Sequence, residues 1–449
     1  MSEEKYQINQ AELDRAVKAV KAIKDGPRVL QLYMDICAKC GTCAEQCHVS
    51  HGNPIRRTNP AFRSDRVRKL YNADRSIFGK VFSVLGGNNG PVLDKDTLEE
   101  WVRDFYECSG CRRCAKFCPF GIDNSVITRK GRAILHVLGM SPSKMAETQE
   151  ISDKFGNDEG QSYKAFLEAV RFLEEELLEE HGIPIKIPVD QQADVLFVPA
   201  SADLISFPET QMGCATFFHA AGIQWTMSSE AFDGANFGLF TGDDEHMKRK
   251  NKLLHVACIK LKVKKLIIGE CGHAYRIAKY IGGANYWGKD IPYEITNIFT
   301  VAAEALRRGA LKLDSSRNPM PVSYHDPCNF ARSAGITEEP REILRACVQD
   351  YREMTPNRDL NWCCGGGGGL AVLDGFERVK KNEVTFLEYR MNVAGKKKLE
   401  QILATEAEYI AAPCANCKRQ LMQLMEYHKL DVQVGGVFDL FDKAVILQK

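Results

Sequence analysis

The arrangement of the cysteines constrains this chain more than any other feature of its sequence. The chain has 449 residues and 17 cysteines. Its first residues, Met1-Ser2-Glu3-Glu4-Lys5, lack the pattern of a signal peptide, so we expect a reducing compartment in which thiols form no disulfide framework. Most of the thiols fall into three tight groups, and their spacing must therefore be explained in another way.

Two of these groups share the spacing C-x2-C-x2-C-x3-C, one from Cys37 to Cys47 and one from Cys108 to Cys118. The spacing is typical of two-cluster ferredoxins, in which the fourth thiolate of each motif ligates the other cluster. We therefore expect two [4Fe-4S] cubanes, one on Cys37, Cys40, Cys43 and Cys118 and one on Cys108, Cys111, Cys114 and Cys47. His48 stands where proline usually follows, which leaves the ligands intact but predicts a different local turn.

The third group places five thiols between Tyr324 and Lys418, two of them adjacent. Adjacent cysteines rarely chelate one small ion, because neighbouring side chains diverge, but they suit a multi-iron cluster. Five glycines follow the pair, and a backbone without side chains can approach a cluster and donate N–H groups to it. The candidate ligands are Cys328, Cys363, Cys364, Cys414 and Cys417, the candidate cofactor-binding glycines are Gly365, Gly366 and Gly367, and His325 is a candidate catalytic residue.

Other interpretations of these residues stay open. A zinc site on four of the five thiols leaves Cys328 without a role, and a phosphate-binding loop needs a strand-glycine-helix context that the glycine run lacks. His325 is either a donor or proton relay beside the cluster or a turn histidine held by backbone. We expect core packing for Cys214, Cys258 and Cys347, whereas the sequence assigns no firm role to Cys271 or His273.

The second half of the chain contains an internal duplication. Apolar runs with strand character at 193–199 and 265–271 are matched by runs at 321–326 and 409–414, with helical segments between them. Alternating strands and helices predict α/β domains around small parallel sheets, with the cysteines at the strand ends.

Overlaying the two copies shows a loss of thiols in the first. Ser201 falls against Cys328, Phe232-Asp233-Gly234 against Cys363-Cys364-Gly365, and Cys271-Gly272-His273-Ala274 against Cys414-Ala415-Asn416-Cys417. Because only Cys271 matches a ligand position, we expect the first copy to hold no metal.

The expected fold class is α+β and α/β, with a helical two-[4Fe-4S] ferredoxin-type domain followed by two tandem α/β cysteine-rich domains. The expected segments are an N-terminal helix (1–30), the ferredoxin-like domain (31–140), a helical linker (141–190), a degenerate α/β domain (191–312) and an intact one with the third cluster (313–449).

Charge and hydropathy exclude several classes of protein. The 60 Lys and Arg residues nearly equal the 59 Asp and Glu residues, so bulk charge gives no reason to expect nucleic acid as a partner. No apolar run is long enough to span a bilayer, so we expect a cytoplasmic protein that reaches a membrane only through partner subunits. Basic runs at Arg56–Lys69, Lys396–Lys398 and Lys418–Arg419 are either solvated faces or surfaces that attract an acidic partner.

The five-cysteine pattern and the ferredoxin module before it resemble the cysteine-rich (CCG) domain family, which includes the B and D subunits of heterodisulfide reductase. The module order resembles that of the D subunit, and the single intact motif is most similar to DsrK, TmcB and HmcF, iron–sulfur subunits of membrane complexes in sulfate respiration. The resemblance covers nearly all of the chain from Leu32. The gap between Cys364 and Cys414 is longer than usual, which indicates an insertion around Asn382 to Lys398.

The resemblance implies a non-cubane [4Fe-4S] cluster on the five thiols, at which a disulfide is cleaved or thiols are released in two one-electron steps. It implies a heterodisulfide reductase-like oxidoreductase, the catalytic subunit of a complex peripherally bound to the inner face of the cell membrane. The implied partners are a membrane cytochrome b-type subunit, other subunits of the complex, and a thiol/disulfide substrate that is small or is a DsrC-like protein. The alternatives are a pure electron relay, the iron–sulfur subunit of a lactate, glycolate or glycerol-3-phosphate dehydrogenase, and a zinc-stabilised interaction module.

Overall fold

The computed structural model describes Arg15, Lys18, Ala19 and residues 26–75, 95–288, 290–376 and 385–447. The helix expected near the N-terminus therefore lies largely outside the described residues. The chain forms two compact units. The helical unit comprises Met1–Ala146, Gly238–Asp243 and Gly365–Lys397, and the sheet unit comprises Glu147–Phe237, Asp244–Cys364 and Lys398–Lys449.

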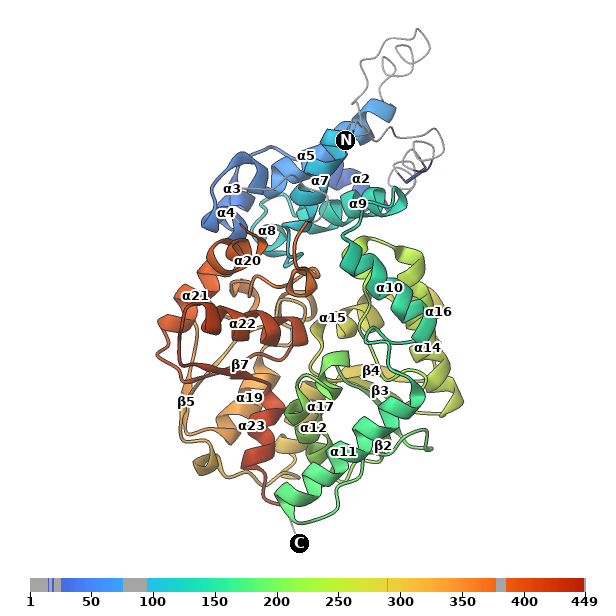
Figure 1. The fold of residues 1–449 in the computed structure, drawn as a ribbon, viewed down its shortest axis with the longest axis vertical. Helices are drawn as coiled ribbons and strands as arrows, with labels where there is room; N and C mark the ends of the chain where they lie inside the picture. The colour runs from blue at the N-terminus through green and yellow to red at the C-terminus, as the bar shows by residue number, and fades with distance from the viewer. Residues whose placement is uncertain are drawn as a thin grey trace, which may run out of the picture. The chain divides into compact units, whose positions relative to one another are not determined.

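The helical unit contains both ferredoxin-type motifs (Figure 1). Its elements are α2 (Arg28–Asp35), α3 (Thr42–Glu45), α4 (His48–Gly52), η1 (Arg56–Thr58), α5 (Pro60–Arg75), α7 (Lys95–Tyr106), α8 (Arg113–Lys116), α9 (Asn124–Val137), α13 (Gly238–Thr241), η6 (Leu370–Val372), α20 (Phe386–Glu388) and the π-helix η7 (Tyr389–Ala394). The short helices α3 and α8 follow Gly41 and Arg112, whose φ angles of 89° and 63° turn the chain between the second and third cysteine of each motif. Helix α7 packs on α9 at Gly131, where a Cβ would lie 2.4 Å from the Phe105 ring.

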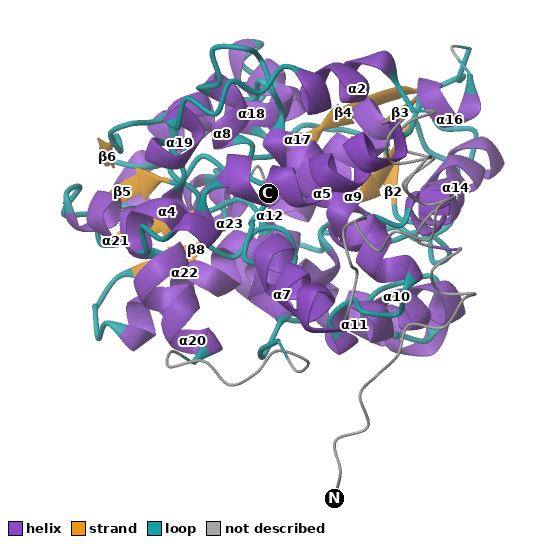
Figure 2. Ribbon diagram, turned by 90° about the horizontal axis from the view of Figure 1, so that it is seen from above, coloured by secondary structure: helices purple, strands orange, loops and turns teal. Residues whose placement is uncertain are grey.

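The sheet unit contains two four-stranded parallel sheets with equivalent strand orders, β2-β1-β3-β4 and β6-β5-β7-β8. The strands are β1 (Val195–Val198), β2 (Trp225–Thr226), β3 (Lys265–Ile268), β4 (Glu294–Asn297), β5 (Pro321–Tyr324), β6 (Asp350–Arg352), β7 (Tyr409–Ala411) and β8 (Gln433–Gly435). Figure 2 shows that strands are confined to these small sheets and that helices form most of the rest. This repeated topology confirms the expected fold class.

Helices connect the strands of each sheet, as parallel pairing requires. The helices of the described part of the sheet unit are α11 (Tyr163–His181), α12 (Pro208–Ala220), α14 (Asp244–Lys260), α15 (Gly272–Tyr275), η3 (Arg276–Ile281), α16 (Ala284–Trp287), α17 (Ile298–Arg307), α18 (Ala331–Ala334), α19 (Glu338–Cys347), α21 (Lys396–Leu403), α22 (Ala415–Tyr427) and α23 (Val437–Ala444), with 3-10 turns η2 (Ser201–Leu204), η4 (Ser315–Arg317) and η5 (Arg358–Leu360). Of these, in chain order, α11 precedes the first strand, α17 lies between the two sheets, and α23 follows the last strand. The boundary between the two units falls within α10 (Ser143–Phe155).

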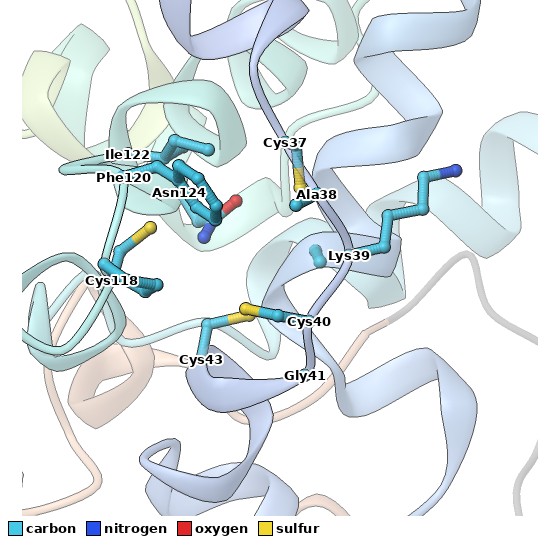
Figure 3. A pocket seen from close by; sticks show the side chains of 12 residues that line it. Cys37, Ala38, Lys39, Cys40, Gly41, Cys43, Cys118, Phe120, Ile122 and Asn124 are labelled. Carbon is cyan, nitrogen blue, oxygen red and sulfur yellow. The ribbon is translucent and has the colours of Figure 1, made fainter.

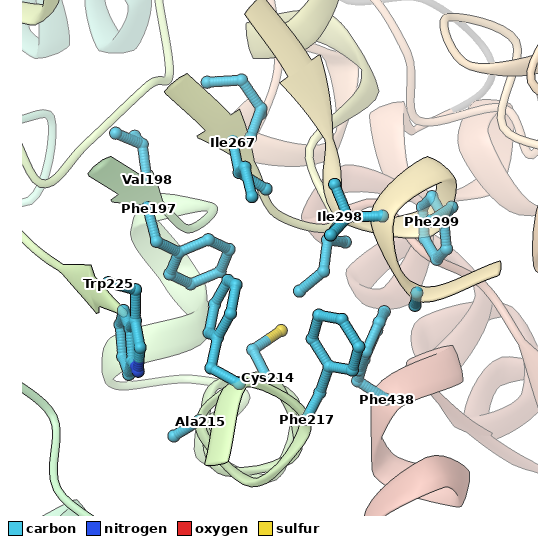
Figure 4. Close-up of a cluster of buried hydrophobic side chains, with 14 of the residues drawn as sticks. Phe197, Val198, Cys214, Ala215, Phe217, Trp225, Ile267, Ile298, Phe299 and Phe438 are labelled. Atoms are coloured by element: carbon cyan, nitrogen blue, oxygen red, sulfur yellow. The ribbon is translucent and has the colours of Figure 1, made fainter. Parts of the chain in front are cut away.

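One hydrophobic core serves both sheets of the sheet unit (Figure 4). Phe218 stacks on Trp225 with ring centroids 4.7 Å apart. Helix α12 approaches α23 so closely that a Cβ on Gly213 would lie 2.0 Å from the Phe438 carbonyl oxygen. The scattered thiols Cys214, Cys258 and Cys347 are buried in this core, where packing accounts for them.

Candidate metal centres

The first candidate cubane site is a hollow lined by Cys37, Cys40, Cys43 and Cys118. Figure 3 shows the four thiols around a common space: Cys37 and Cys40 come from the loop before α3, Cys43 from α3 itself, and Cys118 from the loop before α9. The Cys40 thiol is exposed to solvent, whereas Cys43 is buried and the other two are half-buried. The structure thus brings together the four thiols that the spacing groups, although iron ligation itself stays a prediction.

The second candidate cubane site is lined by Cys47, Cys108, Cys111 and Cys114. Three of these thiols are buried, and Cys108 is half-buried. The buried guanidinium of Arg63 shares the hollow, with Nη2 4.0 Å from Cys47 Sγ. Burial alone would raise the pKa of Cys47, but the Arg63 guanidinium and hydrogen bonds from the Ser50 and Val49 backbone help to lower it below its usual value. The basic run around Arg56–Lys69 is therefore not simply a solvated face, because Arg63 lies inside beside thiols.

His48 explains why proline is absent after Cys47. Its Nδ1 lies 2.8 Å from the Ala394 carbonyl oxygen and its Nε2 lies 2.8 Å from Ser109 Oγ. A carbonyl oxygen only accepts, so Nδ1 carries the proton, and in the neutral ring Nε2 accepts from the Ser109 hydroxyl. The imidazole thus connects Ser109 in the loop of the second motif with Ala394 in η7. Proline has no side-chain hydrogen-bonding group and cannot make either hydrogen bond.

The glycine run packs on the backbone of the second motif within the helical unit. A Cβ on Gly367 would lie 2.7 Å from the Ser109 carbonyl oxygen, and one on Gly368 would lie 3.0 Å from that of Cys108. Gly365, Gly368 and Gly369 adopt φ angles of 98°, 65° and 87°, which other residues rarely adopt. Close packing therefore accounts for the run, and a contact of Gly365, Gly366 or Gly367 with a cofactor stays a prediction.

The third candidate site gathers the five thiols of the cysteine-rich segment in the sheet unit. Cys364 Sγ lies 3.2 Å from Cys417 Sγ, and Cys417 also contacts Cys414. Cys328 contacts Cys363. The hydrogen bonds with Cys364 and Cys414 stabilise the protonated Cys417 thiol and raise its pKa, and burial and neighbouring thiolate charge act in the same direction.

The main-chain setting explains this convergence. Cys328 follows β5, and Cys414 follows β7 and precedes the first residue of α22, so both lie beyond the carboxyl ends of paired parallel strands. The first turn of α22 then supplies Cys417. Five thiols exceed the four ligands of a zinc ion, so this donor set fits a polynuclear iron–sulfur cluster better than it fits one small ion.

His325 lies with the thiols at this site. One of its ring nitrogens, Cys364 Sγ and Cys417 Sγ lie within 4.8 Å of one another. The ring is buried, and burial lowers its pKa well below the usual value. Nδ1 faces the Asn361 amide nitrogen at 3.4 Å, and the amide also donates to the Asp326 carbonyl oxygen. A neutral imidazole beside the thiols fits a polar or proton-transferring group, but its catalytic role stays a prediction.

Protein side chains fill the equivalent region of the first copy. Phe232 stacks on Phe166 of α11 with centroids 4.3 Å apart. The Asp233 carboxylate accepts from the Asp158 N–H at 2.8 Å and lies 3.4 Å from Lys250 Nζ. An aromatic stack and a buried ion pair thus occupy the positions that correspond to the adjacent cysteines.

Cys271 of the first copy lies beside a candidate ligand of the third site. Its backbone pairs with that of Cys414 across the two copies. Its thiol lies 3.4 Å from His273 Nδ1, and His273 Nε2 accepts from the Asn236 N–H at 3.0 Å. Burial lowers the pKa of His273 to about 4, so this imidazole is neutral and braces the junction between the copies.

The sequence predicted the wrong environment for two lysines of the sheet unit. Lys398 and Lys418 are both fully buried, so the solvated or substrate-steering interpretation of their basic runs is wrong for them. Lys418 Nζ donates to Asp203 at 2.9 Å and to Thr210 at 2.7 Å. On α21 the buried residues are Lys398, Gln401 and Ile402. Their i, i+3, i+4 spacing puts them on one face of the helix, and this pattern in the sequence could have predicted that Lys398 is buried.

Two protein families match this chain. Residues 33–122 match the 4Fe-4S dicluster domain, and residues 322–422 match the cysteine-rich (CCG) domain. No helix in the part of the chain that the structure describes combines the length and apolarity needed to cross a bilayer.

Relatives align with almost the whole chain. An Hdr-like menaquinol oxidoreductase iron-sulfur subunit of Archaeoglobus profundus is 28% identical over 94% of this chain and 81% of its own length. A second such subunit, from Archaeoglobus fulgidus, is 28% identical over 96% of this chain and 83% of its own. The D subunit of the dihydromethanophenazine:CoB--CoM heterodisulfide reductase of Methanosarcina mazei is 23% identical over 92% of this chain and 95% of its own. The chain therefore combines a 4Fe-4S dicluster domain with a cysteine-rich (CCG) domain, and it is similar over nearly its whole length to iron–sulfur subunits of Hdr-like menaquinol oxidoreductases and to D subunits of heterodisulfide reductases.

Proposed function

We propose that this chain is the catalytic iron–sulfur subunit of a membrane-associated respiratory complex and that it carries two cubanes and one non-cubane [4Fe-4S] cluster. A membrane cytochrome b-type subunit exchanges electrons with the cubanes, and a thiol/disulfide substrate reacts at the third site. Relatives described as menaquinol oxidoreductase and heterodisulfide reductase subunits support this assignment.

The observation that carries the proposal is the convergence of five thiols and a buried imidazole beyond β5 and β7. Disulfide reduction consumes two electrons and two protons, RS–SR′ + 2e⁻ + 2H⁺ → RSH + R′SH. A cluster held by the five thiols would supply one-electron redox chemistry at this place. Cys328 is half-buried whereas the other four thiols are buried, so substrate approaches from the Cys328 side.

The two cubane sites of the helical unit differ in how exposed their thiols are, and this difference indicates which site meets the partner. The site with the exposed Cys40 exchanges electrons with the partner, and the more buried second site lies further along the path. Arg132 donates to the carbonyl oxygens of Cys108 and Gly368, and thereby holds the second motif against the glycine run.

The substrate class is a thiol/disulfide pair, either a small molecule or a protein of the DsrC type. The test is electron paramagnetic resonance of the anaerobically purified chain before and after a candidate disulfide is added. We expect a substrate-dependent signal that is lost in Cys364→Ser and kept in Cys258→Ser, whose thiol lies in the core. A signal that survives Cys364→Ser would contradict the proposal.

A pure electron relay is the second candidate, and the burial of four of the five thiols favours it. A chain that contains the third centre but gives no signal and no turnover with small or protein disulfides, while it still passes electrons to another carrier, would support the relay.

A further inference from the structure

Lys398 is a buried cation without a carboxylate partner among the described residues of the sheet unit. Its side chain is 0% exposed. Nζ donates to Asn361 Oδ1 at 2.7 Å and to Gln401 Oε1 at 2.5 Å, and it lies 3.5 Å from Met354 Sδ. All three acceptors are neutral. A buried ammonium is strongly disfavoured unless a negative charge lies near it.

Lys418 is a buried lysine of the same unit that does have carboxylate partners. It is equally buried, but its Nζ lies 2.9 Å from the Asp203 carboxylate and 3.9 Å from Glu270. Lys250, also buried, has Asp233 and Asp158 beside it. Lys398 therefore differs from two buried lysines of the same unit, and its missing counter-charge requires an explanation.

The groups around Lys398 point to the third site as the source of that charge. The Asp326 carboxylate is already held by both Nη atoms of Arg341, at 2.8 and 2.7 Å. Burial lowers the pKa of Lys398 to about 7, and ionised Asp326, Cys364, Cys363 and Cys417 each act in the opposite direction. Asn361 links the two places, because its Oδ1 faces Lys398 and its amide nitrogen faces His325 beside the thiols.

We infer that Lys398 is the internal counter-cation of the thiolate-bound cluster at the third site, a positioning residue held in place by Asn361 and Gln401. The inference rests on the proposed function. An iron–sulfur cluster on thiolates is anionic and gains negative charge on reduction, so a fixed cation nearby stabilises the reduced state most. Lys398 therefore raises the reduction potential of the third centre, and the bound cluster in turn stabilises the buried ammonium.

The test compares the iron-free chain, in which Lys398 has no counter-charge among the described residues, with the chain that carries the cluster. Lys398→Met removes an uncompensated charge from the iron-free chain, so its unfolding temperature should rise above that of the wild type. In the loaded chain the same variant should shift the third centre to a more negative midpoint potential, with both cubane potentials unchanged. Lys398→Gln keeps a hydrogen-bonding group without the charge and should shift the potential in the same direction.

Lys418→Met is the matched control. It leaves the buried carboxylates of Asp203 and Glu270 without their cation, so it should lower the unfolding temperature of both the loaded and the iron-free chain. A wild-type potential in Lys398→Gln, or an iron-free Lys398→Met that is less stable than the wild type, would overturn the inference. Absence of a third centre from the wild type would instead overturn the proposed function, so the two failures are distinguishable.

Discussion

His48 Nδ1 lies 2.8 Å from the carbonyl oxygen of Ala394, and this hydrogen bond joins residues that are 346 positions apart in the chain. It connects α4, which directly follows a candidate cubane ligand, to the π-helix η7. Tyr389 makes a second such connection by donating from Oη to the Glu107 carbonyl oxygen at 2.7 Å. Residues 385–394 thus pack on the ferredoxin-type motifs as part of the helical unit.

Replacing His48 by alanine should loosen this attachment. The change leaves the buried Ala394 carbonyl without its donor, which costs about 2 kcal/mol. We expect a lower denaturant midpoint and faster proteolysis within residues 385–397. Equal protease resistance of His48→Ala and wild type would show that the bond does not hold the segment.

Gly367→Ala should disturb the second cubane site from a distance. The new methyl group meets the Ser109 carbonyl oxygen at 2.7 Å, and backbone must move to relieve the overlap. We expect roughly 1–3 kcal/mol of destabilisation and slower reduction of the third centre by the cubanes in rapid-mixing experiments. Gly375→Ala meets no atom within 4 Å and serves as the control. Normal reduction rates in Gly367→Ala would remove the glycine run from the electron path.

Arg63→Met should lower the reduction potential of the second cubane alone. Its guanidinium is 2% exposed and faces the Cys47 thiol, so its loss removes a fixed positive charge beside that cluster. Arg66 lies on the same helix but binds the carboxylates of Asp104 and Glu100. Arg66→Met should therefore change stability without moving the potential. Redox titration of both variants measures the difference, and equal cubane potentials in wild type and Arg63→Met would count against this role.

His181 should make the stability of the sheet unit depend on pH. Its Nε2 lies 3.0 Å from Asp442 Oδ1, and this hydrogen bond raises the pKa of His181 above 6.5, with Glu180 acting in the same direction and burial and Arg317 against it. The pKa of His181 is higher in the folded state than in the unfolded state. The interaction therefore contributes its full stabilisation to the folded state below about pH 6.5, and this stabilisation is lost as pH rises through the folded-state pKa.

His181→Gln should therefore unfold at a lower temperature than wild type at pH 6, and the gap should narrow towards pH 8. Thermal unfolding across this range provides the measurement, and added salt should shrink the gap because the pair is partly exposed. A gap that widens with rising pH would reverse the assigned sign.

Local spacing and periodicity predict much of the fold and of the candidate sites. The x2 intervals between cysteines predict three thiols of each hollow, because the reach of a tight loop is a local property, and the two-cluster ferredoxin pattern predicts that the fourth thiol comes from the other motif. The repeated strand and helix pattern predicts two equivalent parallel sheets, since period and length are also local. The loss of thiols from the first copy was visible in Phe232 and Asp233, which the structure shows packed against Phe166 and Lys250.

Long-range relationships were beyond the sequence. Nothing near Ala394 indicates that it meets His48, and three consecutive lysines at 396–398 suggest a solvent-facing run, whereas the rotation of α21 turns Lys398 inward. The glycine run suggested approach to a cofactor, whereas its described neighbours include the Ser109 backbone, the Met145 side chain and residues of η7. Such pairings depend on tertiary packing, which a single sequence does not display.

The most direct test of a third cluster on the five thiols is the iron and sulfide content per chain of anaerobically purified wild-type protein and of Cys364→Ser. We expect iron for two cubanes and a third cluster in the wild type, and selective loss of the third in the variant. Iron for two cubanes alone in the wild type, or zinc bound to the five thiols, would contradict this assignment.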